Sequence, residues 1–151
     1  MRHVDDLPAV SRLIVTSDGS TTLMLQALVG GDVSVKVQEE RVVVSNEFSD
    51  PISKAGLMGT ILVRRSQLVF GQTVLSENLV LYAGEQGFWD PKVERPLGLQ
   101  INESGAFQRR RILTSGVDPL NGRVFKEYVI ESSRASPIYV RETFSPEFVP
   151  A

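Results

Sequence analysis

Two adjacent arginines in the middle of an apolar segment are the residues that first suggest chemistry in this chain. Arg64 and Arg65 lie within residues 60–69, TILVRRSQLV, whose aliphatic content is typical of a buried strand. Alternate residues of a strand point to opposite faces, so we expect one arginine on each face. A guanidinium that is buried needs an anionic partner or ligand. The segment therefore indicates an anion site; the simpler alternative is that both side chains reach water at the sheet edge.

A single carboxylate interrupts an apolar face near the end of the chain. A strand is expected over residues 137–144, with one face formed by Ile138, Val140, Glu142 and Phe144. The other face, formed by Tyr139, Arg141 and Thr143, is expected to meet water. Apolar surroundings would raise the pKa of Glu142 and a neighbouring arginine would lower it. Glu142 is thus a candidate for proton transfer or for orienting a basic group of a ligand; the alternative is a structural ion pair with Arg64 or another arginine.

The bulk composition is that of an ordinary globular domain. The chain has 151 residues, 42% hydrophobic and 23% charged, with a formal net charge of −2. This predicts one domain over residues 1–151, with residues 1–10 flexible. The charge argues against a nucleic-acid partner, although arginines in a pocket can still attract a small anionic substrate. No apolar run approaches the ~20 residues of a membrane span and the first ten residues lack a signal-peptide core, so we expect no membrane partner and a cytoplasmic location.

The residues that many metal and nucleophilic sites require are missing. The chain has no cysteine and one histidine, His3. This excludes disulfides, thiolate zinc sites and a cysteine nucleophile. His3 lies in the segment expected to be frayed, which argues against most metal sites and against a Ser-His-Asp arrangement. No glycine loop for a phosphate and no metal-ligand spacing occurs, so neither a metal nor a cofactor is expected.

The elements that must position Arg64 and Glu142 form a predicted antiparallel sheet. Ser20 can cap a helix over residues 21–29 that ends at Gly30, and the first ordered element is expected at 12–16. Further strands are expected at 32–38, 73–82, 107–113 and 123–131. Residues 42–44 are either a continuation of the first of these or a separate short strand. About six strands, joined mostly by hairpins, predict an α+β fold with one antiparallel sheet and helices packed on one face.

The remaining segments are expected to be loops or exposed surface. Residues 45–59 are predicted to be a loop or lid with one helical turn after Pro51, and residues 83–95 a second long loop in which Trp89 is a local anchor. Residues 99–106 have no clear type. A strand at 107–113 would place Arg109 and Arg111 on one face. The run Arg109–Arg111 is interpreted most simply as a solvated face, and it is too short for a nucleic-acid arm.

Four segments carry a resemblance to one known family. They are RLIVTSDGSTTLMLQALVGGDVSVKV at 12–37, LVRRSQL at 62–68, PLG at 96–98 and SPIYVRETFSP at 136–146. In this order they resemble the chorismate lyase superfamily (chorismate–pyruvate lyase, 4-hydroxybenzoate synthase), and in particular its short archaeal, cyanobacterial and mycobacterial branch. The match places the family's strand arginine at Arg64 and the glutamate of its closing strand at Glu142.

The resemblance implies a chorismate lyase-like fold and a carbon–oxygen lyase that needs no cofactor and releases pyruvate from chorismate to leave 4-hydroxybenzoate. Arg64 would clamp a carboxylate and Glu142 would act as acid and base. Leu97 and Gly98 would contact the ligand, as would Lys126, which lies about where a second arginine is expected. The loops at 45–59 and 83–95 would be flaps over the pocket.

Several departures from the family pattern leave other functions open. Arg141 replaces a usual threonine, Ser66 replaces a branched aliphatic residue, and Arg109–Arg111 falls where relatives often have a carboxylate. One alternative is the same fold redirected to another substrate, as a cyclase or pericyclase of secondary metabolism. The other is a non-catalytic module that binds a small ligand, a role that this fold has in some transcription regulators.

Overall fold

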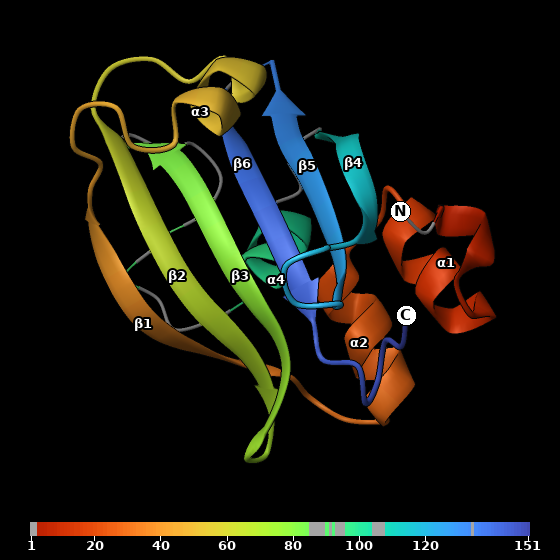
Figure 1. Ribbon diagram of the computed structural model, residues 1–151. Coiled ribbons are helices and arrows are strands. Elements are labelled where there is room, and N and C mark those ends of the chain that lie inside the picture. The colour runs from red at the N-terminus through yellow and green to blue at the C-terminus, as the bar shows by residue number, and fades with distance from the viewer. Residues whose placement is uncertain (1–2, 85–89, 91, 93–95, 104–107, 134) are drawn as a thin grey trace.

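An antiparallel sheet forms the centre of the molecule (Figure 1). The computed structural model describes residues 3–84, 90, 92, 96–103, 108–133 and 135–151. Within this part of the chain the sheet has six strands in the order β1-β2-β3-β6-β5-β4. The strands are β1 (Ser34–Val42), β2 (Ile61–Phe70), β3 (Thr73–Ala83), β4 (Arg109–Val117), β5 (Val124–Ser132) and β6 (Ala135–Phe144). The predicted α+β class with one antiparallel sheet is confirmed.

Short helices cover the sheet. They are a 3-10 turn η1 (Val4–Asp6) and the helices α1 (Ala9–Thr16), α2 (Thr21–Val29), α3 (Ser49–Ala55) and α4 (Leu97–Glu103). Buried residues of α1, α2 and α4 pack on the same face of the sheet. α3 packs on the opposite face, at one end of β2, β3 and β6 (Figure 1). None of the helices in the described part of the chain has the length and apolar character of a membrane span.

The predicted helix at residues 21–29 is confirmed as α2. The backbone N–H of Leu23 donates to the side chain of Ser20 at 3.3 Å, which satisfies one of the N–H groups that a helix start leaves without a partner. Gly30 ends the helix with φ 74°, a left-handed conformation that glycine adopts without steric cost. The cap fixes where α2 begins, and its first two residues, Thr21 and Thr22, are buried.

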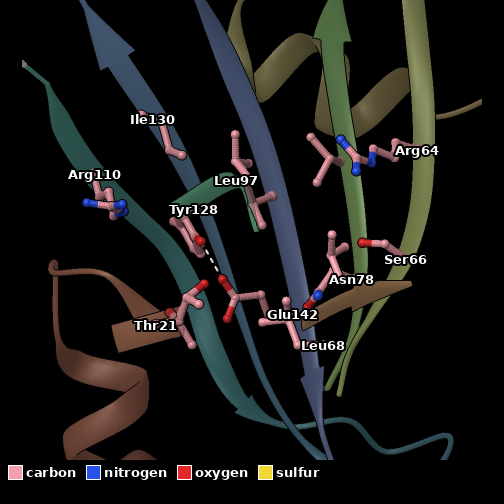
Figure 2. A pocket seen from close by; sticks show the side chains of 14 residues that line it. Thr21, Arg64, Ser66, Leu68, Asn78, Leu97, Arg110, Tyr128, Ile130 and Glu142 are labelled. Atoms are coloured by element: carbon pink, nitrogen blue, oxygen red, sulfur yellow. Dashed lines mark hydrogen bonds between the residues drawn. The ribbon is translucent and has the colours of Figure 1, made fainter. Parts of the chain in front are cut away.

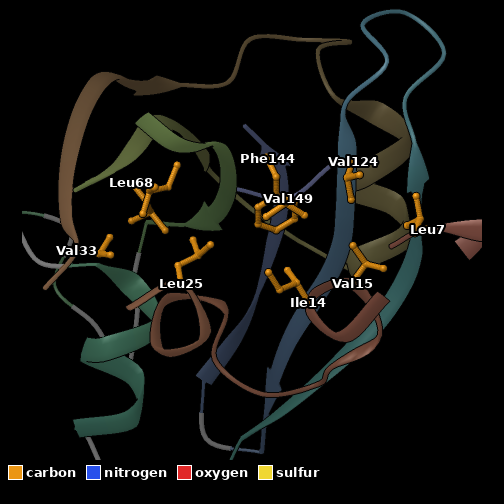
Figure 3. Packing of buried hydrophobic residues seen from close by; sticks show 10 residues of the cluster. Leu7, Ile14, Val15, Leu25, Val33, Leu68, Val124, Phe144 and Val149 are labelled. Carbon is orange, nitrogen blue, oxygen red and sulfur yellow. The ribbon is translucent and has the colours of Figure 1, made fainter. Parts of the chain in front are cut away.

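The largest apolar cluster joins α1 and α2 to the sheet (Figure 3). Its buried members are Leu7, Ile14, Val15, Leu25, Val33, Leu68, Leu75, Val124, Phe144 and Val149. The cluster includes Leu7, which is 1% exposed, and Val149, so residues near both ends of the chain pack together. A hydrogen bond from Ser11 Oγ to the carbonyl of Pro150 also joins the two ends. The first ordered element was expected at 12–16; in the structure this segment belongs to α1, which begins at Ala9, and η1 precedes it. The flexibility expected for residues 1–10 stays a prediction, but at Leu7 the segment is packed.

Tyr139 lies on the face opposite Glu142, as expected, but its expected exposure to water is wrong. Tyr139 is 2% exposed and belongs to a cluster with Ala55, Leu57 and Val63 beneath α3. Its hydroxyl donates to Glu127 Oε2. A phenol is buried readily when its O–H finds an acceptor, and α3 supplies the apolar cover that the sequence did not reveal.

The same helix corrects the prediction for residues 45–59. α3 occupies much of this segment and packs on the face that carries Val63 and Tyr139, whereas Arg64 and Glu142 point to the other face. The segment therefore does not cover the predicted site. Residues 85–89, 91 and 93–95 of the other expected flap, Trp89 among them, lie outside the described residues.

Candidate functional site

Strand register brings Arg64 and Glu142 to one face of the sheet. Arg64 is paired with Val80 of β3, which is paired with Val140 of β6. Glu142 lies two residues beyond Val140 on the same strand. From strand spacing and rise, the Cα atoms of Arg64 and Glu142 are about 12 Å apart. Two residues that are distant in sequence thus project from the same face of the sheet, with the side chains of Val80 and Val140 between them.

A small cavity lies between this face and the helices (Figure 2). Its volume is about 40 Å³, enough for about three water molecules. This volume is smaller than an organic ligand, so residues around the cavity would have to move for one to bind. Its lining residues are Thr21, Thr22, Val35, Arg64, Ser66, Leu68, Asn78, Val80, Leu97, Arg110, Tyr128, Ile130, Val140 and Glu142.

Arg64, and not Arg65, points into the cavity. Arg64 is 3% exposed and lines the cavity. Arg65 has a side chain that is 49% exposed and forms an ion pair with Glu39 at 3.4 Å on the outer face. The two arginines therefore separate between the faces as strand alternation predicts. The role of Arg64 as a carboxylate clamp stays a prediction.

A bulge in the edge strand places a carboxylate beside Arg64. The register of β1 against β2 shifts between Val37 and Glu39, so Gln38 is an extra residue and Glu40 comes opposite Arg64. The hydroxyl of Tyr82 donates to Glu40 Oε1. Burial and this hydrogen bond raise the pKa of Tyr82, which keeps the phenol protonated as a donor. The bulge thus adds an acidic group at the β1 end of the site.

Glu142 is buried in the cavity as a hydrogen-bonded carboxyl group. It is 4% exposed, and its Oε1 accepts a hydrogen bond from the hydroxyl of Tyr128 (Figure 2). Burial raises the pKa of Glu142, and the Tyr128 hydrogen bond, the charge of Lys126, the side chain of Thr21 and the charge of Arg110 partly oppose this. Its Oε2 is buried and has no hydrogen-bond partner in the described part of the chain. The hydrogen-bond partner of this carboxyl is therefore a tyrosine, and the raised pKa favours the protonated acid.

Lys126 lies outside the described lining of the cavity, and its contact with a ligand stays a prediction. The side chain is fully buried and its Nζ donates to the carbonyls of Ile14, at 3.2 Å, and of Ser17. An ammonium in the interior needs such acceptors, and here the end of α1 provides them. Lys126 is not among the described residues that line the cavity. It acts on the site through its charge, which lowers the pKa of Glu142.

The segment containing Leu97 and Gly98 reaches the cavity from the helix side. Leu97 lines the cavity at the start of α4, and Gly98 follows it within the helix. The sequence suggested no element for residues 99–106; α4 extends through Glu103, and residues 104–107 lie outside the described part. Contact of Leu97 and Gly98 with a ligand stays a prediction.

The sequence interpretation missed Arg110. It assigned the whole run Arg109–Arg111 to solvent, but only Arg109 and Arg111 lie on the outer face, where both bond to Glu131. Arg110 lines the cavity. Strand alternation within the run was the available signal, because three consecutive residues of a strand cannot share one face.

A metal site is not indicated in the described part of the chain, where no three His, Asp or Glu side chains are grouped so that they could hold an ion. The cavity offers two guanidinium groups, one carboxyl, and hydroxyl and amide groups. Such a set can bind an anionic organic molecule and can transfer a proton to it.

Comparison with known proteins supports the fold. By sequence, the chain matches no family model and no curated protein. By structure, it is similar to the possible transcriptional regulator YydK of Bacillus subtilis, with 12% identity over 76% of this chain and a TM-score of 0.54. The chain spans 59% of the length of YydK. A gene product of Staphylococcus aureus has a TM-score of 0.58 and 10% identity, with 88% of this chain and 92% of that protein covered.

These similarities are consistent with the chorismate lyase-like fold expected from the sequence. At such low identity they concern the fold alone, and function depends on the particular residues in the cavity.

Proposed function

We propose that the chain is a chorismate lyase-like enzyme that eliminates pyruvate from chorismate and releases 4-hydroxybenzoate. The observation that carries the proposal is that Arg64 and Glu142 line the same cavity. The resemblance assigned these two residues to the site from the sequence alone. Strand register then brings them to the same face, although β3 lies between their strands.

Arg64 would bind a carboxylate of the substrate. A guanidinium can donate two parallel hydrogen bonds to a carboxylate, and the low exposure of Arg64, 3%, strengthens them by limiting competition from water. The side chains of Val80 and Val140 form an apolar floor between Arg64 and Glu142. This floor suits a six-membered ring whose polar substituents reach the two ends.

Glu142 would act on the enolpyruvyl ether as a protonated acid. The ring C–O bond breaks and its electron pair leaves with the ether oxygen, which takes the proton of Glu142. The adjacent ring carbon loses its hydrogen as a proton to the Glu142 carboxylate, the ring becomes aromatic, and the released enol tautomerises to pyruvate. The carboxyl ends the cycle protonated. Burial favours this starting state because it raises the pKa of Glu142.

A second candidate function is a ligand-binding module without catalysis. It is favoured by the fold shared with YydK, which is described as a possible transcriptional regulator. Arg64 and Glu142 would then hold an anionic effector that is not converted.

Incubation with chorismate distinguishes the two functions. We expect chorismate to raise the melting temperature and to be converted to equal amounts of 4-hydroxybenzoate and pyruvate, measured by chromatography and by a lactate dehydrogenase assay. Absence of both effects contradicts the lyase proposal. A rise in melting temperature without product favours the binding module, and mass spectrometry of small molecules that copurify with the protein would then identify its ligand.

A further inference from the structure

A row of polar side chains crosses the cavity face of the sheet beside Glu142. Strand register places Asn78 of β3 directly opposite Glu142 of β6, and Ser66 of β2 directly opposite Asn78. Side chains opposite each other on neighbouring strands have Cβ atoms about 5 Å apart. All three residues line the cavity, and in Figure 2 Asn78 lies between Ser66 and Glu142. Asn78 is therefore the polar neighbour of Glu142 on the side of β2.

The residues before and after this row are apolar. Leu68 and Phe144 belong to the cluster on one side of it, and Val80 and Val140 to the cluster on the other. A polar side chain in such surroundings costs free energy unless it is hydrogen-bonded. Packing alone thus does not account for an amide at position 78.

Ser76 holds the Asn78 side chain in place. It lies two residues earlier on the same face of β3 and is 1% exposed. Its Oγ donates a hydrogen bond to Asn78 Oδ1 at 3.1 Å. A carboxamide has an acceptor oxygen on one arm and two N–H donors on the other. Because Ser76 binds the oxygen, the N–H groups of Asn78 are left for a ligand.

The position of Asn78 indicates which ligand group its amide can recognise. From strand spacing and rise, the Cα atom of Asn78 is about 8 Å from that of Arg64 and about 5 Å from that of Glu142. The charged guanidinium of Arg64 suits a carboxylate, whereas an amide N–H is a neutral donor that suits a hydroxyl oxygen. A ring held by its carboxylate at Arg64 would direct a substituent at its far end toward Asn78 and Glu142.

We propose that Asn78 is a specificity-determining residue whose amide donates a hydrogen bond to the ring hydroxyl of the ligand, and that Ser76 is the positioning residue for this amide. The cavity then selects ring carboxylates that carry a hydroxyl group at the end opposite the carboxylate. This inference rests on the proposed function, because Arg64 must hold the carboxylate for the hydroxyl to meet Asn78.

Binding of benzoate and 4-hydroxybenzoate, which differ only in the hydroxyl group, tests this role. In the wild-type protein we expect calorimetry to show that 4-hydroxybenzoate binds more tightly by about fivefold or more. Asn78→Leu has a similar volume without the amide. It should weaken binding of 4-hydroxybenzoate about 5- to 10-fold, which lies within the range for a hydrogen bond between uncharged groups, while the affinity for benzoate stays within about twofold.

Two serine variants separate positioning of the amide from an effect on folding. Ser76→Ala keeps Asn78 but releases its amide oxygen, and it should reduce the preference for 4-hydroxybenzoate while the affinity for benzoate is retained. Ser11→Ala makes the same change at another buried serine, which bonds to the carbonyl of Pro150. Ser11 is not among the described residues that line the cavity, so this variant should keep the wild-type preference.

The role of Asn78 is overturned if the wild-type protein binds the two acids equally or binds neither, or if the preference persists in Asn78→Leu. Should Asn78→Leu fail to fold, an unchanged preference in Ser76→Ala overturns the role, and a loss of preference in Ser76→Ala but not in Ser11→Ala supports it. Chorismate turnover by the wild-type protein separates these outcomes from failure of the lyase proposal. Turnover without a preference that depends on Asn78 overturns this role alone, and such a preference without turnover supports the role and overturns the lyase.

Discussion

Tyr128 donates its phenolic hydrogen to Glu142 Oε1 at the centre of the cavity. The two side chains belong to neighbouring strands, and they are 5% and 4% exposed. Burial raises the pKa of both groups, so the pair favours a neutral phenol beside a neutral carboxyl. The raised pKa moves Glu142 toward the protonated acid, and a carboxyl in that state can give a proton to a ligand.

Replacement of this tyrosine tests the hydrogen bond. Tyr128→Phe leaves the buried carboxyl without its donor and should lower the free energy of unfolding by about 1–3 kcal/mol. Replacing both partners leaves no buried polar group without its partner. The double variant Tyr128→Phe with Glu142→Leu should therefore lose less free energy of unfolding than the sum of the two single variants, by about 1 kcal/mol or more. Urea unfolding of the four proteins measures this coupling. Additive costs would mean that the hydrogen bond does not contribute to stability.

The raised pKa of Glu142 predicts a particular pH dependence of stability. The unfolded carboxyl loses its proton near its ordinary pKa of about 4.3, whereas the folded one keeps it to higher pH. Between these two pKa values the unfolded state binds fewer protons, so stability falls as pH rises. Glu142→Gln has no titrating carboxyl at this position and so lacks this pH-dependent loss of stability. As pH rises from the unfolded pKa to the folded pKa of Glu142, the variant should become progressively more stable relative to the wild type. A difference that stays constant with pH would show that burial does not raise this pKa.

The two adjacent arginines provide a matched pair for ligand binding. Arg64→Lys replaces a planar fork with a point charge and should weaken binding of 4-hydroxybenzoate about tenfold, as expected for loss of one charged hydrogen bond. Arg65→Lys makes the same chemical change on the outer face, where Arg65 pairs with Glu39, and should leave affinity within about twofold. Equal effects of the two variants in calorimetry would contradict the assignment of Arg64 as the carboxylate clamp.

Lys126 should affect stability more than binding. Lys126→Met removes charged hydrogen bonds to the carbonyls of Ile14 and Ser17, at a cost of about 1.5–3 kcal/mol that release of a buried charge partly offsets. Affinity for 4-hydroxybenzoate should stay within about threefold, because the ammonium is directed at α1. Loss of affinity comparable to that of Arg64→Lys would restore Lys126 as a ligand contact.

Local patterns predicted the elements whose signals are themselves local. Ser20 and Gly30 defined α2 to the residue, and strand alternation correctly separated Arg64 from Arg65. Glu142 was recognised because it was the one charged residue on an otherwise apolar face.

Tertiary contacts determined what the sequence patterns did not predict. Tyr139 is buried because α3 folds over it, and the bulge at Gln38 that brings Glu40 beside Arg64 has no local signal in the sequence. Alternation placed Arg109 and Arg111 on one face, but the three arginines were still interpreted together as solvated, so the inward direction of Arg110 was missed.

Pyruvate release from chorismate by two glutamate variants tests the central claim most directly. Glu142→Gln and Glu127→Gln make the same change at buried carboxyls that each accept a hydrogen bond from a tyrosine, on opposite faces of the sheet. We expect the wild-type protein to form pyruvate, Glu142→Gln to be slower by about 10²-fold or more, as for loss of a general acid, and Glu127→Gln to keep most of the activity. No pyruvate from the wild-type protein, or an undiminished rate in Glu142→Gln, would contradict the account.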